Sequence, residues 1–436
     1  MFNTFSKKLF ALFLLSIFLL PLERIGSFNL AGLNVRISQI LVLLIFLLYA
    51  LYSFYKKEWK IKISRPLILY ILFLIVALVS ICFAREKTRG VMVLSFSAFM
   101  ILVPLVSVFM VDTKRRLKIV LYILLASAFI FSLFGFFQFL GDMVGVSPAI
   151  TGLAVRYTKE VLGFPRIQST FIEPLYFANY LLMPLLLSFF FLLKRIDPKR
   201  NIFFLILFLV SLIVLILTVS KGALISLGII ALAVAVFQIR SVFSQKNLPY
   251  LLFILLFVTL IGWGAYSSLS SQADIGKYYT KAYDIITGAS ITERQEAYDV
   301  AFEAFNKSPI IGIGIGGFGP YFSGYPLSAP DSGWPITNNE YLEVLSETGI
   351  VGLFFFLLFV CSVFYYSVQA YKNTEDVFLK TVLFALNLAF LGVLIQYMTF
   401  STLYIMHIWV LIGLILATQH IILGDVNYHG GKISKS

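Results

Sequence analysis

Residues 201–237 read NIFFLILFLVSLIVLILTVSKGALISLGIIALAVAVF, and this stretch decides the fold class. Two apolar runs flank the short turn Ser220-Lys221-Gly222, and each is close to the roughly 20 residues that a helix needs to cross the hydrocarbon core of a bilayer. A helix satisfies its own backbone hydrogen bonds in lipid, whereas an isolated strand does not. The stretch therefore predicts a hairpin of two transmembrane helices.

The rest of the chain has the same character. Of its 436 residues, 60% are hydrophobic and only 13% are charged, against about 25% charged in soluble domains. This composition excludes soluble enzymes, nucleic-acid-binding modules and disordered tails. Two cysteines and three histidines exclude a disulfide framework and a His-rich metal site. We expect an all-α fold, a polytopic membrane helix bundle that forms one integral membrane domain over residues 1–436.

Hydropathy predicts twelve spans and their orientation. If the N-terminus is cytoplasmic, the inner segments hold 21 of the 34 Lys and Arg residues, as the positive-inside rule requires. Both ends are then cytoplasmic, and the two longer outer loops cover about 141–168 and 270–340. The spans are expected at about 8–24, 37–55, 66–83, 91–111, 117–140, 169–193, 201–219, 222–239, 249–269, 341–367, 379–400 and 404–423.

The long outer loop carries several chemically distinctive segments. Residues 291–306 have the pattern of an amphipathic surface helix with Arg294 in its first turn, where Arg294 either serves a ligand or pairs with a neighbouring acid. Residues 312–319 contain G-x-G-x-x-G, but the strand and βαβ context of a dinucleotide site are absent from the pattern. We interpret this segment as a turn that lets the backbone approach a ligand or the membrane closely.

Carboxylates gather where the loop enters the next span. Glu340, Glu343 and Glu347 fall within about 60° of one another on a helix. A charge facing lipid costs several kcal/mol, so these side chains face a cavity, a basic partner or water. Thr337 or Asn338 is expected to cap this helix.

Two further ionisable residues lie at span ends. Lys221 occupies the outer turn quoted above, and Glu173 begins the span at 169–193. A lysine at a helix end commonly snorkels to the interface. Ionisable groups in spans are also functional hypotheses in their own right. Both interpretations stay open for Lys221.

Several short motifs occur in a fixed order across residues 165–365. They are the segment 166–179, SKGA at 220–223, Arg294, PIIGIG at 309–314, NNEYLE at 338–343 and ETGIVGL at 347–353. In this order and membrane placement they resemble the O-antigen polymerase and O-antigen ligase family of bacterial envelope proteins.

The resemblance implies an inverting glycosyltransferase of the bacterial inner membrane that acts on an undecaprenyl-diphosphate-linked glycan at the outer face. Membrane lipids and a chain-length regulator are the further partners it suggests. A diphosphate leaving group needs cations, and Arg166, Lys221 and Arg294 are the candidates. The outer loops contain no D-x-D motif, so we expect a metal-independent reaction without a cofactor.

Two positions depart from the family pattern. Lys221 stands where the family commonly has Arg, and Asn338 stands where the ligase branch has His. Asn cannot act as a general base, so either the reaction depends on leaving-group stabilisation, or a carboxylate such as Glu173, Glu340 or Glu343 takes that role. We therefore predict a polymerase that joins lipid-linked repeat units. The alternatives are a ligase that transfers the glycan to a lipid or protein acceptor, and a lipid-linked oligosaccharide flippase.

Overall fold

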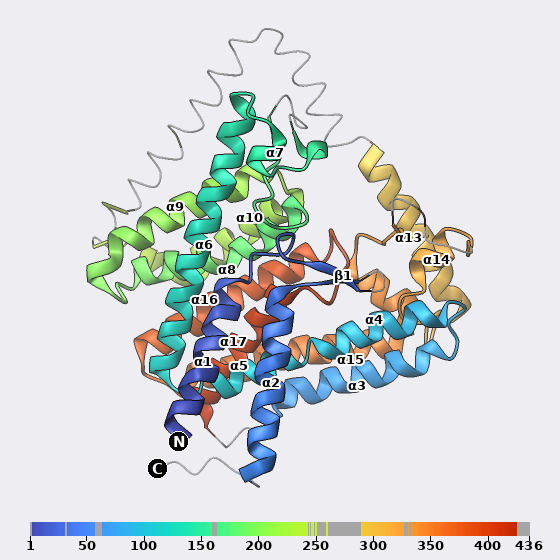
Figure 1. Ribbon diagram of the computed structural model, residues 1–436, viewed down its shortest axis with the longest axis horizontal. Helices are drawn as coiled ribbons and strands as arrows, with labels where there is room; N and C mark the ends of the chain where they lie inside the picture. The colour runs from blue at the N-terminus through green and yellow to red at the C-terminus, as the bar shows by residue number, and fades with distance from the viewer. Residues whose placement is uncertain are drawn as a thin grey trace.

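The computed structural model describes residues 2–424 except 31–32, 57–62, 159–163, 243, 245, 248, 251–258, 260–288, 327–329 and 331–332. Nearly all of its regular structure is helical, as Figure 1 shows. The elements are α1 (Phe2–Phe18), β1 (Phe28–Leu30), β2 (Leu33–Val35), α2 (Ile37–Lys56), α3 (Arg65–Ile81), α4 (Lys87–Phe99), α5 (Leu102–Met110), α6 (Lys114–Met143), α7 (Pro148–Thr151), η1 (Val155–Tyr157), α8 (Pro174–Leu193), η2 (Pro198–Arg200), α9 (Asn201–Leu217), α10 (Lys221–Val242), α13 (Ala289–Lys307), α14 (Phe318–Phe322), α15 (Glu340–Lys372), α16 (Val377–Gln396) and α17 (Met406–Leu423).

The chain is a multi-pass membrane protein. Within the described residues, eight helices are long and apolar enough to cross a bilayer, with Arg65–Ile81 and Lys221–Val236 as shorter apolar helices. The expected span at 249–269 lies almost entirely outside the described residues, so the count of twelve stays a prediction. The eight helices are Ile37–Lys56, Lys87–Met110, Lys114–Met143, Pro174–Leu193, Pro198–Leu217, Glu340–Lys372, Val377–Gln396 and Met406–Leu423.

The all-α prediction holds except for one β-hairpin. Strands β1 and β2 pair antiparallel, with Phe28 opposite Val35 and Leu30 opposite Leu33. Hydropathy treats this segment only as a connection between two spans. Three-residue strands are too short for a periodicity of two to stand out in the sequence.

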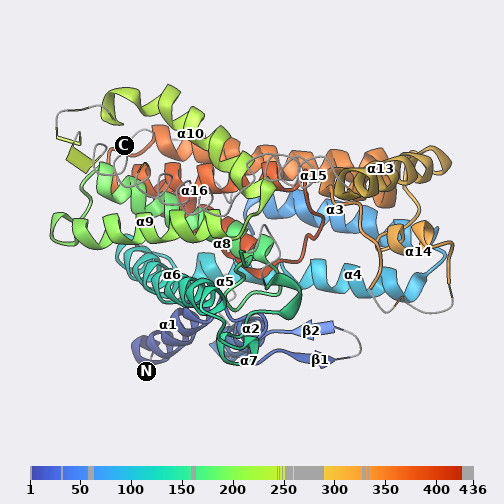
Figure 2. The ribbon, with the colours of Figure 1, turned by 90° about the horizontal axis from the view of Figure 1, so that it is seen from above.

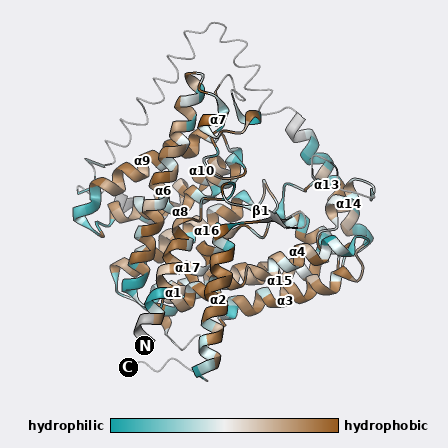
Figure 3. Cartoon of the chain, in the orientation of Figure 1, coloured by the Kyte–Doolittle hydropathy of each residue, from teal (hydrophilic) through white to brown (hydrophobic). Residues whose placement is uncertain are grey.

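Helices α8, α16 and α17 form the centre of the bundle. Most of their side chains are buried on all sides, as expected for helices that are apolar around their whole circumference. Helices α9, α10 and α15 pack around them. In Figure 3, hydrophilic residues gather at helix ends and along α13, while the helix bodies are hydrophobic.

Contacts between helix ends assign these ends to two opposite ends of the bundle. At one end, Lys114 pairs with Asp376 and Arg65 donates to Tyr366 at 3.1 Å. At the other end, the α15 start is tied to the α16 end, because the Glu340 amide donates to the Tyr397 carbonyl at 2.8 Å. In Figures 1 and 2, α13, α14 and the hairpin lie to the right, whereas α1 begins at the left. The start of α15, with α13 and α14 packed against it, therefore lies at the opposite end from the Lys114–Asp376 pair.

Candidate functional site

Helix α15 is broken after its first turns, and this break shapes the site. Gly349 has φ 66° and ψ −172°, a conformation essentially restricted to glycine. A Cβ at Gly349 would overlap the backbone of Ile310, and a Cβ at Gly312 would overlap the backbone of Glu347. These two glycines therefore let the loop over residues 309–314 lie directly against α15.

Four backbone hydrogen bonds use the groups that the break releases. Towards the start of α15, the amides of Ile313 and Gly314 donate to the carbonyls of Ser346 and Glu347, at 3.0 and 2.9 Å. Beyond the break, the amides of Ile350 and Val351 donate to the carbonyls of residues 309 and 310, at 2.9 and 3.3 Å. The two glycine-bearing motifs thus form one docked unit, which the sequence shows only as separate segments.

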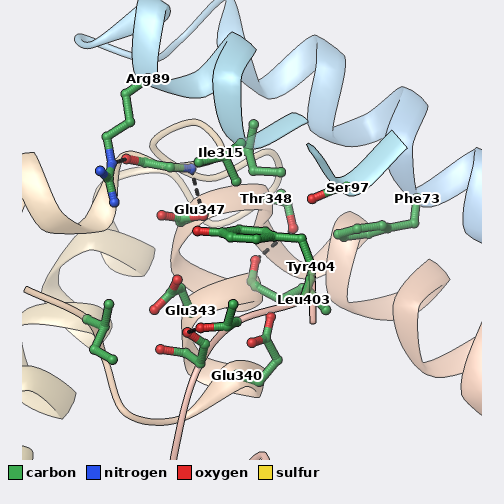
Figure 4. A pocket seen from close by; sticks show the side chains of 16 residues that line it. Phe73, Arg89, Ser97, Ile315, Glu340, Glu343, Glu347, Thr348, Leu403 and Tyr404 are labelled. Carbon is green, nitrogen blue, oxygen red and sulfur yellow. Dashed lines mark hydrogen bonds between the residues drawn. The ribbon is translucent and has the colours of Figure 1, made fainter. Parts of the chain in front are cut away.

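A polar pocket lies between this docked loop, the start of α15 and the segment after α16. Its volume is about 60 Å³, which is room for a few water molecules. A sugar ring would need the pocket to widen. In Figure 4, the side chains of Glu340, Glu343 and Glu347 enter it from one face of α15. The remaining walls come from Phe73, Arg89, Val93, Ser97, Ile315, Gly316, Ile336, Val344, Thr348, Ser401, Thr402, Leu403 and Tyr404.

The three carboxylates have different environments. Glu347 accepts from the amides of Gly316 and Phe318, at 2.8 and 3.0 Å. Glu343 accepts from both the amide and the hydroxyl of Thr337, at 3.2 and 3.0 Å. Glu340 is 2% exposed, and its Oε2 has no hydrogen-bond partner among the described residues. Both carboxylate oxygens of Glu347 are thus hydrogen-bonded to loop amides, whereas Oε2 of Glu340 can still accept a hydrogen bond or a proton.

The three cations predicted from the sequence converge. Arg166 and Arg294 both lie close enough to Lys221 to act on its charge, although the three residues come from three separate segments. Nε of Arg166 donates to the Thr218 carbonyl at 3.2 Å, which fixes the arginine beside the turn between α9 and α10. We name Arg166, Lys221 and Arg294 the cation set. Like charges repel, so such a group favours an anionic ligand between its members.

Residues 397–404, which connect α16 to α17, lie between the cation set and the pocket. Gly222, next to Lys221, packs so closely on Thr399 that a Cβ would overlap the threonine hydroxyl. Tyr298, one helical turn after Arg294, donates to the Met398 carbonyl at 3.4 Å. Residues 401–404 of the same segment line the pocket. The cations and the carboxylates therefore flank one short piece of chain.

The other two predicted site residues lie beside these groups. Glu173, at the start of α8, pairs with Arg156 at 3.9 Å, and their side chains are 41% and 62% exposed. Such a pair contributes little to stability. Asn338 has φ 54°, a left-handed conformation that Asn tolerates better than most residues.

One expectation about this region is wrong. Asn339, and neither Thr337 nor Asn338, caps α15, since its side chain accepts from the amides of Tyr341 and Leu342. The hydroxyl of Thr337 is instead engaged with Glu343. Three consecutive residues of a type that caps helices make this position ambiguous in the sequence.

Sequence reasoning did not select Arg89. This residue lies in the first turn of α4, lines the pocket, and donates through Nε to the Gly316 carbonyl at 2.7 Å. It thus supplies positive charge beside the carboxylates. Its only signal in the sequence is its place among the charges before a span. Helical periodicity places Glu347 in the acidic stripe, but its role in holding the loop depends on the break at Gly349.

A series of buried polar side chains links the N-terminal segment to Ser226 in α10, the helix that Lys221 begins. Glu23 and Arg36 flank the hairpin and pair at 3.1 Å, with His407 Nδ1 3.7 Å from Glu23. Each residue along this path is at most 9% exposed. From His407 the chain continues through Asn179 at 2.9 Å and Gln396 at 3.3 Å to Ser226 at 3.4 Å.

Among the described residues, no three His, Cys, Asp or Glu side chains are arranged to hold a metal ion.

Comparison with known families confirms the resemblance. A family model described as O-antigen ligase matches residues 180–357. The matched segment contains Lys221, Arg294, Asn338, Glu340 and Glu343. No match to a curated protein was found.

Proposed function

Because residues 180–357 match the O-antigen ligase family, which acts on lipid-linked glycans, we propose that this glycosyltransferase-like enzyme is a polymerase. It transfers a growing glycan from polyprenyl diphosphate to the next lipid-linked repeat unit. The observation that carries the proposal is that neighbours of Lys221 and Arg294 contact Thr399 and Met398, while residues 401–404 of the same segment line the carboxylate pocket.

The proposed reaction assigns a role to each group. The acceptor hydroxyl oxygen bonds to the anomeric carbon, and the bond from that carbon to the diphosphate breaks with inversion. The diphosphate leaves with the electron pair, and the cation set stabilises its charge. Glu340 takes the proton of the acceptor hydroxyl, because its unbonded oxygen can accept it. Glu343 is the second candidate for the base.

Asn338 supports the polymerase over the ligase. An amide cannot take up a proton at neutral pH, so the ligase-branch role of His at this position is lost. The description of the matching family favours the ligase alternative. A flippase is less well supported, because a transporter places its binding groups near the bilayer midplane, whereas the cation set and pocket lie at one end of the bundle.

Purified protein and lipid-linked repeat units, without any other acceptor, test the proposal. We expect a ladder of products of increasing length. Single transfer to an added terminal acceptor, with no extension of the repeats, would establish a ligase instead. Glu340→Gln should reduce extension severely with folding intact. If Glu343→Gln has that effect and Glu340→Gln does not, the base is Glu343.

The proposed location is the bacterial inner membrane, with both ends cytoplasmic and the site on the outer face. Ser323→Cys, beside α14, should react with a membrane-impermeant thiol reagent in intact cells. This assay needs a background in which the exposed Cys82 and Cys361 are replaced by serine. Protection of Ser323→Cys, together with labelling of a cysteine placed at Lys114, would reverse the orientation.

A further inference from the structure

Three aromatic residues form a ledge beside the pocket. We name Tyr321, Tyr325 and Trp334 the aromatic ledge; each is half-buried. The rings of Tyr321 and Tyr325 are 5.9 Å apart and nearly perpendicular, at 88°. The guanidinium of Arg85 lies 4.3 Å from the centre of the Tyr325 ring, and that of Arg89 lies 5.3 Å from the Trp334 ring. The three rings, with the guanidinium groups of Arg85 and Arg89 beside them, are thus partly exposed at the protein surface.

The ledge is continuous with the pocket. Arg89 both lines the pocket and lies over Trp334. Gly319, which follows the docked loop, approaches Trp334 so closely that a Cβ there would be 2.8 Å from the tryptophan Cβ. Trp334 therefore lies beside Arg89, one of the residues that line the pocket.

The polar partners of Tyr321 indicate that the ledge faces water. Its hydroxyl donates to Glu303 at 2.7 Å and also contacts Lys307. Lys307 and Glu303 pair at 3.0 Å with side chains 58% and 61% exposed. Hydrogen bonds from Tyr321 and then Lys307 lower the pKa of the Glu303 carboxyl, so this acid stays charged. An exposed ion pair is costly against acyl chains, which argues against a membrane-anchoring aromatic belt.

The backbone at Tyr325 is also held in an unusual conformation. Its φ is 57°, which a bulky aromatic residue rarely adopts. The amide of Tyr325 donates to the Pro320 carbonyl at 2.7 Å, which closes the turn after α14. Such strain commonly marks positions where a side chain is aimed for a purpose. Here it places the Tyr325 ring against Tyr321 and under Arg85.

We propose that the aromatic ledge is a saccharide-binding subsite that holds the glycan portion of the lipid-linked substrate as it extends from the pocket. This inference rests on the proposed function. The apolar C–H face of a pyranose ring packs on an aromatic ring, while Arg85, Glu303 and Lys307 offer hydrogen bonds to the sugar hydroxyls. A few such polar groups placed around aromatic walls are typical of a small-ligand site. The diphosphate belongs at the separate cation set.

Binding and catalysis are measured separately. The probe is the lipid-free oligosaccharide released by mild acid from the same lipid-linked repeat units, and its binding is followed by calorimetry. Trp334→Ala and Tyr325→Ala should each weaken binding by about threefold to tenfold, from the worth of one aromatic contact. Both should raise KM for the lipid-linked repeats by a similar factor and leave kcat nearly unchanged.

Matched controls separate a binding role from a folding role. Trp334→Phe and Tyr325→Phe keep a ring and should bind the oligosaccharide nearly as well as the unaltered protein. Tyr365, 58% exposed on the distant part of α15, gives a control in Tyr365→Ala, which should change nothing. Unaltered binding in both ledge alanine variants, or equal loss in Tyr365→Ala, would overturn the subsite. Failure of the unaltered protein to make a ladder, with ledge-dependent binding intact, would instead refute the polymerase.

Discussion

Replacement of Gly349 by alanine tests whether the docked loop builds the site. If the backbone keeps its conformation, the alanine must adopt φ and ψ angles that favour glycine, which costs about 1–3 kcal/mol. The overlap of its Cβ with Ile310 adds to this cost. If the loop moves away instead, the four backbone hydrogen bonds between residues 309–314 and 346–351 are lost. At about 0.5–1.5 kcal/mol each, that route costs about 2–6 kcal/mol. We expect local destabilisation of about 3 kcal/mol by either route.

Hydrogen exchange measures this change at defined amides. A local cost of about 3 kcal/mol corresponds to roughly 100-fold faster exchange through local opening. We expect this acceleration at Gly314 and Ile350, which are bonded across the junction, with helical content preserved. Glycosyl transfer should fall strongly. Glu347 would lose its hydrogen bonds from the Gly316 and Phe318 amides, and the pocket would lose the wall that this loop forms.

Gly228 provides the matched control. It lies inside α10, and a Cβ there would meet nothing within 4 Å. Gly228→Ala should be neutral or stabilising by up to about 1 kcal/mol, because alanine favours helices. Unchanged exchange at Gly314 and Ile350 in Gly349→Ala, together with normal activity, would refute the argument that this junction supports the site.

Four further outcomes are expected. Arg294→Ala should lower the transfer rate by a factor of about 10²–10³ while helix content stays the same. Near-normal activity of this variant would mean that Arg294 is a surface residue without a role in transfer. Lys221→Arg should keep activity because it preserves the charge. Activity in product-ladder assays should survive EDTA, and a strict requirement for added Mg²⁺ or Mn²⁺ would contradict the proposed cation mechanism. Burial alone raises the pKa of Asp376, but hydrogen bonds from Lys114 and the α16 amides lower the pKa overall. The charged carboxylate therefore stabilises the folded protein at neutral pH. This contribution is lost as pH falls through the lowered pKa. Asp376→Asn, which keeps a capping side chain, should therefore lower the melting temperature more at pH 7 than at pH 3. An equal shift at both would count against the sign of this pKa change.

The sequence by itself determines the membrane class and much of the helical layout. Run length and hydropathy are local properties, so segments such as 201–219 and 379–400 can be identified as spans without knowledge of their neighbours. The acidic stripe of α15 is equally local, because helical periodicity alone places Glu340, Glu343 and Glu347 on one face. The ordered motifs around Lys221 and Asn338 were enough to indicate the family that residues 180–357 match.

Only the tertiary structure decides which of these local features meet. Arg166, Lys221 and Arg294 come from separate segments, and no periodicity relates their positions; their proximity depends on how the segment before α8, the turn between α9 and α10, and the start of α13 are placed in the fold. Arg89 joins the carboxylates because α4 lies beside the docked loop. The break at Gly349 has its role only through its partner loop, since the released backbone groups find acceptors and donors 33 and 41 residues away in the chain. Composition reports what each segment can bury, whereas the site is made by contacts between segments, which composition does not encode.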